Sequence, residues 1–125
     1  MIVGIGVDQV EVARMEGLLR RRPERARDRL FTGTERSRCE ERDPPWECYA
    51  ARFAAKEAFL KALGTGLGAG TAWREVEVVT DGAGCPRLEL RGAARERMEE
   101  AGGRRAHVSL THEAGVATAF VVVEG

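Results

Sequence analysis

The sequence has few of the features that mark secreted, membrane-bound or metal-stabilised proteins. Its three cysteines lack the CxxC spacing of a zinc site, and no histidine lies near them in the sequence. We therefore expect ordinary thiols in a reducing cytoplasm. The apolar run at the start of the chain ends at Asp8, too early for a signal peptide, and no run approaches the roughly 18 apolar residues that a membrane span needs. Neither secretion nor a membrane partner is expected.

The chain also lacks a surplus of either charge, because 20 Lys and Arg residues face 20 Asp and Glu residues. A protein dedicated to nucleic acids needs a net basic surface to neutralise phosphates, so we expect no nucleic-acid partner. Lysine is scarce: 18 of the basic residues are arginine, and only Lys56 and Lys61 are lysine. Two lysines so close together indicate a local need for a compact ammonium, which a planar guanidinium cannot imitate.

A single domain over residues 1–125 is predicted. Hydrophobic residues make up 43% of the chain, and a fold of this length buries roughly two-thirds of the unfolded chain's surface, so it needs no disulfide. Apolar periodicity separates strands from helices, and a Thr-x-x-Glu capping box begins at Thr32. The expected strands cover 2–7, 73–80, 86–91, 107–111 and 116–124, the expected helices cover 11–22, 32–39, 46–63 and 93–101, and 24–29 form a turn or short helix. This order indicates an α+β fold with an antiparallel sheet packed on a central buried helix.

The helix over 46–63 should be the central one. Its apolar residues lie around almost the whole circumference, which is typical of a helix surrounded by protein. The charged residues that interrupt it need partners, because an unpaired buried ion is strongly destabilising. Glu57 and Lys61 are neighbours one turn apart, whereas Arg52 and Lys56 lie on a different flank. The glycine-rich stretch 64–70 follows this helix instead of preceding one, so it is not a phosphate-binding Walker loop.

Three residues are candidates for chemistry, and each also has a structural interpretation. Asp8 ends a strand face that Gly4 and Gly6 leave bare, and glycine in a strand often marks the close approach of a backbone or a ligand. Asp8 could instead open the next helix, because Asp8 and Glu11 have capping-box spacing.

The other two candidates are Glu57 and His112. Glu57 could form a structural ion pair with Lys61 or Lys56. His112 is expected in the turn of the last hairpin, where a solvated histidine is unremarkable.

Three segments together resemble a known family. They are residues 4–11 (GIGVDQVE), 52–66 (RFAAKEAFLKALGTG) and 108–112 (VSLTH), and in order and spacing they are similar to the signatures of the holo-[acyl-carrier-protein] synthases, the small single-repeat 4'-phosphopantetheinyl transferases. The resemblance covers the whole chain. It implies an α+β fold and the transfer of 4'-phosphopantetheine from coenzyme A to a serine hydroxyl of apo acyl carrier protein, with release of adenosine 3',5'-bisphosphate.

The resemblance also implies roles for individual residues. Asp8 and Glu57 match a pair that holds Mg2+, which would bind the pyrophosphate of coenzyme A, and the bare face at Gly4 and Gly6 would leave room for that approach. Lys61 would place an ammonium against the phosphates. Either Glu57 or a water on the metal could take the serine proton.

The remaining roles concern the two substrates. The positions that match the family's coenzyme A site are Arg52, Lys56, Gly66, Pro86, Ser109, Thr111 and His112. The usual assembly in the family is a trimer with sites between protomers, so His112 would come from the neighbouring protomer. Arg14 and Arg21 resemble the basic helix face that docks the acidic carrier protein.

One departure concerns the motif Gly84-Cys85-Pro86, where many members have lysine in the middle. A contact to coenzyme A is therefore missing unless another residue compensates. A carrier of fatty-acid synthesis and one of polyketide synthesis fit equally, with or without tolerance of acylated coenzyme A. The competing hypotheses are a coenzyme A or nucleotide-binding module without activity and a purely structural oligomer. The retained Asp8, Glu57 and Lys61 speak against the first, and the bare strand face speaks against the second.

Overall fold

The computed structural model describes residues 1–64 and 71–125. The elements in chain order are β1 (Ile2–Glu11), α1 (Val12–Arg21), α2 (Pro23–Leu30), α3 (Gly33–Glu40), α4 (Trp46–Ala62), the 3-10 helix η1 (Trp73–Glu75), β2 (Val76–Thr80), β3 (Pro86–Leu90), α5 (Gly92–Glu100), β4 (Arg105–Glu113) and β5 (Val116–Glu124). The predicted α+β class is confirmed. No helix in the described part of the chain is both long and apolar enough to cross a membrane.

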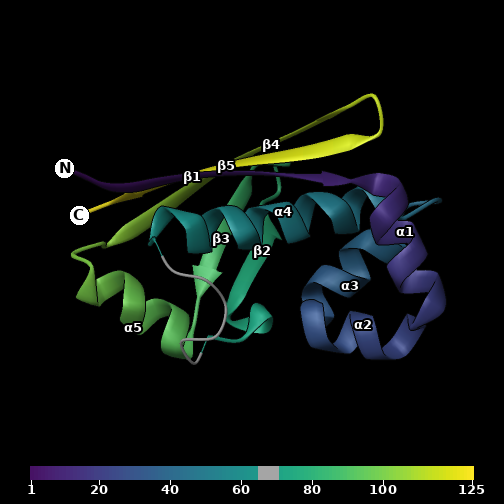
Figure 1. Cartoon of the computed structure of the whole chain (residues 1–125), viewed down its shortest axis with the longest axis horizontal. Coiled ribbons are helices and arrows are strands. Elements are labelled where there is room, and N and C mark those ends of the chain that lie inside the picture. Colours follow the sequence, from purple (N-terminus) through teal and green to yellow (C-terminus); the bar gives the residue numbers. More distant parts are fainter. Residues whose placement is uncertain (65–70) are drawn as a thin grey trace.

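Two antiparallel sheets surround the central helix. One has the order β1-β5-β4, and the other is the hairpin β2-β3. Figure 1 shows α4 running along the three-stranded sheet, with α1, α2 and α3 gathered near one end of the helix and α5 near the other. Two hydrophobic clusters meet at α4, one shared with the sheets and α5 and the other with α1, α2 and α3. The prediction of a helix buried nearly all round is therefore confirmed.

The bare face of β1 lies directly against the backbone of α4. A Cβ atom at Gly4 would lie 1.8 Å from the carbonyl oxygen of Ala62, and one at Gly6 would lie 1.9 Å from that of Ala58. Any side chain at either position would push the strand off the helix. The expectation that these glycines leave room for a ligand is wrong, because α4 already fills that space.

The first strand is longer than predicted. β1 continues to Glu11, because β5 is long enough to pair with it as far as Val116. Asp8 therefore lies inside a strand, and α1 begins at Val12 without a side-chain cap. The capping-box interpretation of Asp8 is wrong, whereas the capping box at Thr32 is confirmed in α3.

Two other boundaries differ from the prediction. The strand expected over 73–80 begins with η1, and only Val76 onward pairs with β3. His112 lies in β4 and not in the turn, because the turn itself is made by Ala114 and Gly115, both at positive φ (53° and 79°).

The expectation of three free thiols is also wrong. Cys39 and Cys48 form a disulfide, with their Cα atoms 5.3 Å apart, that joins the end of α3 to the first turn of α4. The chain reverses direction between these helices, so residues nine positions apart become neighbours. Cys85 is the free cysteine in the described part of the chain, and it is exposed.

Candidate functional site

Asp8 and Glu57 form an acidic pair between β1 and α4. Asp8 pairs in register with the buried Ala119, so its side chain lies on the sheet face that covers α4. The carboxyl group of Glu57 lies near that of Asp8, and burial together with the charge and hydrogen bonding of Asp8 raises the pKa of Glu57. Lys61 donates to Asp8 Oδ1 at 2.7 Å and to the carbonyl oxygen of Val7 at 3.2 Å. The structure thus brings together Asp8, Glu57 and Lys61, to which the resemblance gives the metal-binding and phosphate-binding roles.

The alternative interpretation of Glu57 fails. The ion pair of Lys61 is with Asp8, at 2.7 Å, and Lys56 lies on another flank of α4 with a different partner. Glu57 faces a second carboxyl group, and the charges of Lys61 and Arg14 oppose the rise in its pKa without outweighing it. Glu57 therefore lies beside a group of like charge and does not form the ion pair that the structural interpretation required.

The donor set of the acidic pair fits a hard divalent cation. Two carboxyl groups in contact repel each other when both are ionised, and a cation between them removes that repulsion. No third His, Cys, Asp or Glu completes a ligand cluster within residues 1–64 and 71–125. Mg2+ commonly takes one or two carboxylates and fills its other positions with substrate phosphate oxygens and water, which matches a pair of this kind.

A cavity of about 650 Å³ extends from the acidic pair along α1. We call it the α1 cavity and define it by Asp8, Glu57, Phe53, Arg14 and Arg21, which line it. The two arginines predicted to dock an acidic protein therefore border the same space as the acidic pair. Such a partner would bring its bound segment next to Asp8 and Glu57.

A second cavity of about 370 Å³ lies on another flank of α4. We call it the basic cavity and define it by six lining residues: Arg38, Arg42, Arg52, Thr80, Pro86 and His112. Thr111 also lines it. Four residues assigned to the coenzyme A site by resemblance thus share one cavity, and α4 separates them from the acidic pair.

Arg52 is the buried cation of the basic cavity. It is 6% exposed, and its guanidinium donates to Thr80 Oγ1 at 3.0 Å and to Cys48 Sγ at 3.2 Å. Its Nε has no hydrogen-bond partner in the described part of the chain. Burial and the like charges of Arg38 and Arg42 lower its pKa. A buried guanidinium with an unused donor and two further arginines beside it is suited to a phosphate group.

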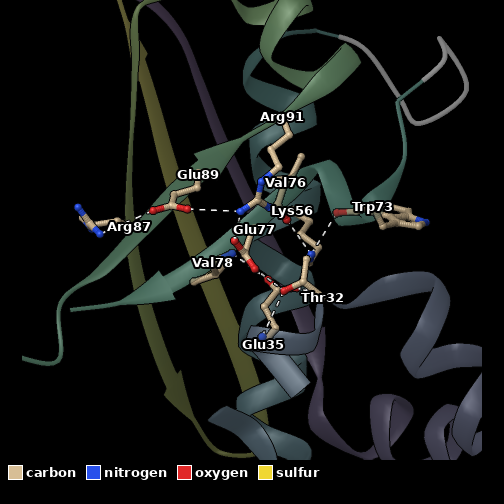
Figure 2. Close-up of polar contacts among 10 residues, drawn as sticks. All are labelled: Thr32, Glu35, Lys56, Trp73, Val76, Glu77, Val78, Arg87, Glu89 and Arg91. Carbon is tan, nitrogen blue, oxygen red and sulfur yellow. Dashed lines mark hydrogen bonds and ion pairs between the residues drawn. The ribbon is translucent and has the colours of Figure 1, made fainter. Parts of the chain in front are cut away.

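Lys56 is not in this cavity. Its side chain is 0% exposed, and Nζ donates to Glu35 Oε1 at 2.8 Å, to the Val76 carbonyl at 2.6 Å and to the Trp73 carbonyl at 3.1 Å (Figure 2). All three N–H groups of the ammonium are used inside the protein. The expectation that Lys56 contacts a nucleotide phosphate is wrong, because α4 turns this residue toward β2.

The remaining predicted residues lie elsewhere or outside the description. Ser109 pairs with Phe120 on the exposed face of the three-stranded sheet, away from α4. Gly66 falls outside the described residues. His112 lies on the inner side of β4 opposite Ala117, where its Nδ1 is 3.0 Å from Glu47 Oε2.

Sequence reasoning missed several residues of these sites. Arg38, Arg42 and Thr80 belong to the basic cavity, and nothing in their local pattern distinguishes them from solvated residues. Glu35 was assigned only to a capping box, which the structure confirms, but it also binds Lys56. The buried position of Lys56 was the signal that could have led to Glu35, because a buried ammonium requires a carboxylate partner.

The comparisons with known proteins agree with this geometry. Residues 4–120 match the family described as the 4'-phosphopantetheinyl transferase superfamily. The chain is similar to the holo-[acyl-carrier-protein] synthase of Methylobacterium radiotolerans, with 51% identity over 128 residues that cover 99% of this chain and 94% of that protein. It is also similar to that of Cutibacterium acnes, with 50% identity over 125 residues that cover both chains completely.

Solved structures extend the similarity to the fold. The crystal structure of the Neisseria meningitidis holo-[acyl-carrier-protein] synthase aligns with a TM-score of 0.90 and 34% identity over all of both chains. The Helicobacter pylori enzyme in complex with coenzyme A aligns with a TM-score of 0.85 and 29% identity, covering 96% of this chain and 99% of that one. The match over almost the whole length, on a fold that holds the acidic pair in place, means that this chain belongs to the 4'-phosphopantetheinyl transferase superfamily.

Proposed function

We propose that this chain transfers 4'-phosphopantetheine from coenzyme A to a serine hydroxyl of an apo acyl carrier protein, releasing adenosine 3',5'-bisphosphate. The relatives named as holo-[acyl-carrier-protein] synthases support this activity. The observation that carries it is the acidic pair with Lys61 beside it, at the end of a cavity that two arginines border. The competing assignment, a coenzyme A-binding module without activity, does not explain why a pair of carboxyl groups is held in contact.

The acidic pair is the proposed Mg2+ site. Bound there, the ion would neutralise the charge that develops on the pyrophosphate as the phosphoanhydride bond breaks. Lys61 has an exposed ammonium that donates to Asp8, so it is close enough to share its donors with a phosphate at the same place. Glu57 borders the α1 cavity, so either Glu57 or a water on the ion could accept the proton of a docked serine hydroxyl.

The basic cavity is the proposed site for the nucleotide part of coenzyme A. The unused Nε of Arg52 and the neighbouring Arg38 and Arg42 support a phosphate there. Gly84 and Pro86 line the same cavity, so the motif that carries Cys85 in place of lysine lies at its edge. We assign the compensation for that missing lysine to Arg38 and Arg42.

We further propose a cyclic trimer with sites shared between protomers. Within one chain the acidic pair and the basic cavity lie on different flanks of α4, so neither is a complete site. The outer face of the three-stranded sheet exposes Ile5, Val7 and Phe120, at 55%, 49% and 45%, and Val7 pairs directly with Phe120. An apolar patch of this kind is typical of a subunit interface. The resemblance implies that in such a trimer His112 of one chain would join the acidic pair of its neighbour.

The acidic carrier protein is proposed to dock on α1. Arg14 and Arg21 border the α1 cavity, so a docked carrier would present its serine beside Glu57. The cytoplasmic location expected from the sequence stays a prediction, to be checked by cell fractionation.

One assay tests the transfer itself. The protein is incubated with coenzyme A, Mg2+ and apo acyl carrier protein, and the carrier is weighed by mass spectrometry. We expect the carrier to gain the mass of one phosphopantetheine, and omission of Mg2+ or addition of a chelator to prevent the gain. Binding of coenzyme A without any mass gain would favour the inactive module and overturn the proposal.

A further inference from the structure

A buried polar cluster connects α3, α4 and β2. We call it the Glu35 cluster and define it by Thr32, Glu35, Lys56 and Glu77. Lys56 and Glu35 are 0% exposed and Glu77 is 3% exposed. Figure 2 shows their polar groups converging in the space between the two helices and the strand, with Arg91 reaching Glu77 from outside. Arg91 donates to Glu77 Oε1 at 2.7 Å, and the hydroxyl of Thr32 donates to the other oxygen of Glu77.

Glu35 and Lys56 together form hydrogen bonds with the backbone groups of β2 on the edge that faces away from β3. Glu35 Oε2 accepts a hydrogen bond from the amide of Val78 at 2.8 Å, and Lys56 Nζ donates to the carbonyl of Val76 at 2.6 Å. On its other edge β2 pairs with β3. A strand edge is normally covered by another strand or left to solvent, whereas here an ion pair from two helices covers it. The ion pair itself is short, with 2.8 Å between Nζ and Oε1 of Glu35.

This contact lies next to the basic cavity. Arg52, one turn before Lys56 on α4, donates to Thr80 Oγ1 at the end of β2. Two contacts therefore join α4 to β2, one at Arg52 inside the cavity and one at Lys56 behind it. The β2-β3 hairpin continues from Thr80 to Gly84 and Pro86, which form the opposite wall of the cavity. The contact at Lys56 is therefore one of the contacts that fix the distance of that wall from Arg52.

We propose that Glu35 and Lys56 are positioning residues for the nucleotide of coenzyme A, acting through the β2-β3 hairpin and Arg52. This inference rests on the proposed assignment of the basic cavity to coenzyme A. Stability alone does not account for the pair, because well-packed apolar residues often replace a buried ion pair at no loss of stability. Apolar side chains cannot, however, bind the Val76 carbonyl and the Val78 amide, and those two bonds hold the hairpin in register with α4.

The first test is Glu35→Gln, measured with coenzyme A and apo carrier as separately varied substrates. The amide is nearly isosteric, but it leaves the Lys56 ammonium without its closest counter-charge, so the hairpin loses its fixed position. We expect KM for coenzyme A and the Kd for adenosine 3',5'-bisphosphate to rise about tenfold, with kcat and the KM for carrier changed less than about twofold. An unchanged KM and Kd in the folded variant would overturn the proposal.

The double variant Glu35→Gln with Lys56→Met separates positioning from stability. It contains no unpaired buried charge, so its melting temperature should recover relative to Glu35→Gln. The double variant removes the ammonium that donates to the Val76 carbonyl, so the KM for coenzyme A should stay raised. Recovery of both the melting temperature and the KM would mean that the pair acts on stability alone. This variant also keeps the proposal testable if Glu35→Gln does not fold.

Two further variants complete the comparison. Met98→Ala removes a buried side chain of α5 that belongs to the hydrophobic core and not to the basic cavity, and it should lower the melting temperature without changing the KM for coenzyme A. An equal rise of KM in Met98→Ala would show that any loss of stability has this effect, and would overturn the inference. Arg52→Gln tests the cavity assignment itself. If Arg52→Gln leaves the KM unchanged, the assignment fails, whereas a rise in Arg52→Gln without one in Glu35→Gln refutes only the positioning role.

Discussion

The pKa values of the carboxyl groups on the two flanks of α4 shift in opposite directions. Toward β1, Glu57 lies near a second carboxyl group, and burial and the charge of Asp8 raise the pKa of Glu57. Toward β2, burial alone would raise the pKa of Glu77, but hydrogen bonds from Thr32 and Arg91 and the charges of Arg91 and Lys56 outweigh it and lower the pKa. In this sense the carboxyl groups of the β2 flank are complete without any ligand, whereas those of the β1 flank are incomplete, because a cation would relieve the repulsion between them. The difference supports the proposal that Asp8 and Glu57 serve the reaction, whereas Glu77 serves the fold.

The largest expected effect comes from removing the charge of either carboxyl group of the acidic pair on the β1 flank. Asp8→Asn and Glu57→Gln each remove a proposed metal ligand, so transfer should fall on the order of a thousandfold. The fold should survive, because removing one of two repelling carboxyl groups costs little stability. Activity is measured at saturating substrates and stability by thermal unfolding. Glu77→Gln is the matched control on the other flank and should keep its kcat, so wild-type activity in Asp8→Asn or Glu57→Gln would refute the metal site.

The second prediction tests whether each active site combines the acidic pair of one protomer with His112 of its neighbour. Asp8→Asn damages the half-site at β1, and His112→Ala damages the half-site at the basic cavity. When the two variants are co-unfolded, mixed equally and refolded, a random cyclic trimer should recover about a quarter of its sites. Each variant refolded alone is the control. If the mixture is no more active than the average of the two controls after confirmed subunit exchange, each chain holds a complete site or His112 is dispensable.

The third prediction concerns stability on the complete flank. Glu77→Gln should lower the free energy of unfolding at pH 7 by about 1–3 kcal/mol, because Arg91 and Thr32 lose their ionised partner. The folded pKa of Glu77 lies below the ordinary value of 4.5, so its stabilisation is present above that pH and is lost as the pH falls through the folded pKa. The difference between wild type and Glu77→Gln should therefore shrink below about pH 4. Denaturant unfolding across the acidic range measures it, and a pH-independent difference would contradict the assigned ionisation.

The smallest expected effect concerns the two arginines of α1 that border the α1 cavity. Arg14→Glu should raise the KM for carrier protein about fivefold, and Arg21→Glu less, because both reverse a positive charge that attracts an acidic partner. The KM for coenzyme A should not change. The defect should diminish at high salt, since screening weakens the charge effect. Equal changes for both substrates, or no dependence on salt, would mean that α1 is not the docking surface.

Local patterns predicted most of the elements but fewer of the site contacts. The apolar circumference of α4 and the alternation in the strands depend only on neighbouring residues, so periodicity revealed both. The end of β1 depends on how far β5 pairs with it, and the Cys39–Cys48 bond depends on how the chain reverses before α4. Neither relation has a local signature, and the predictions there were wrong.

The two lysines show where sequence-based prediction ends. Their scarcity and the resemblance to a known family drew attention to Lys56 and Lys61 and assigned phosphates to both. Lys61 lies beside Asp8 at the surface, whereas Lys56 is sealed inside with Glu35. The helical periodicity places the two lysines on different flanks of the same helix, but it does not show which flank is sealed inside the protein.

The sequence by itself determined the α+β class and the buried central helix, because periodicity is a property of the chain alone, and its resemblance to a known family named Asp8 and Glu57 as a pair. Tertiary structure decided which charges meet. It placed α4 against Gly4 and Gly6, turned Lys56 toward β2 and gathered Arg38, Arg42 and Arg52 around one cavity. The physical reason is that a charged group's role depends on the groups within a few ångströms of it, and in this fold those groups come from distant parts of the chain.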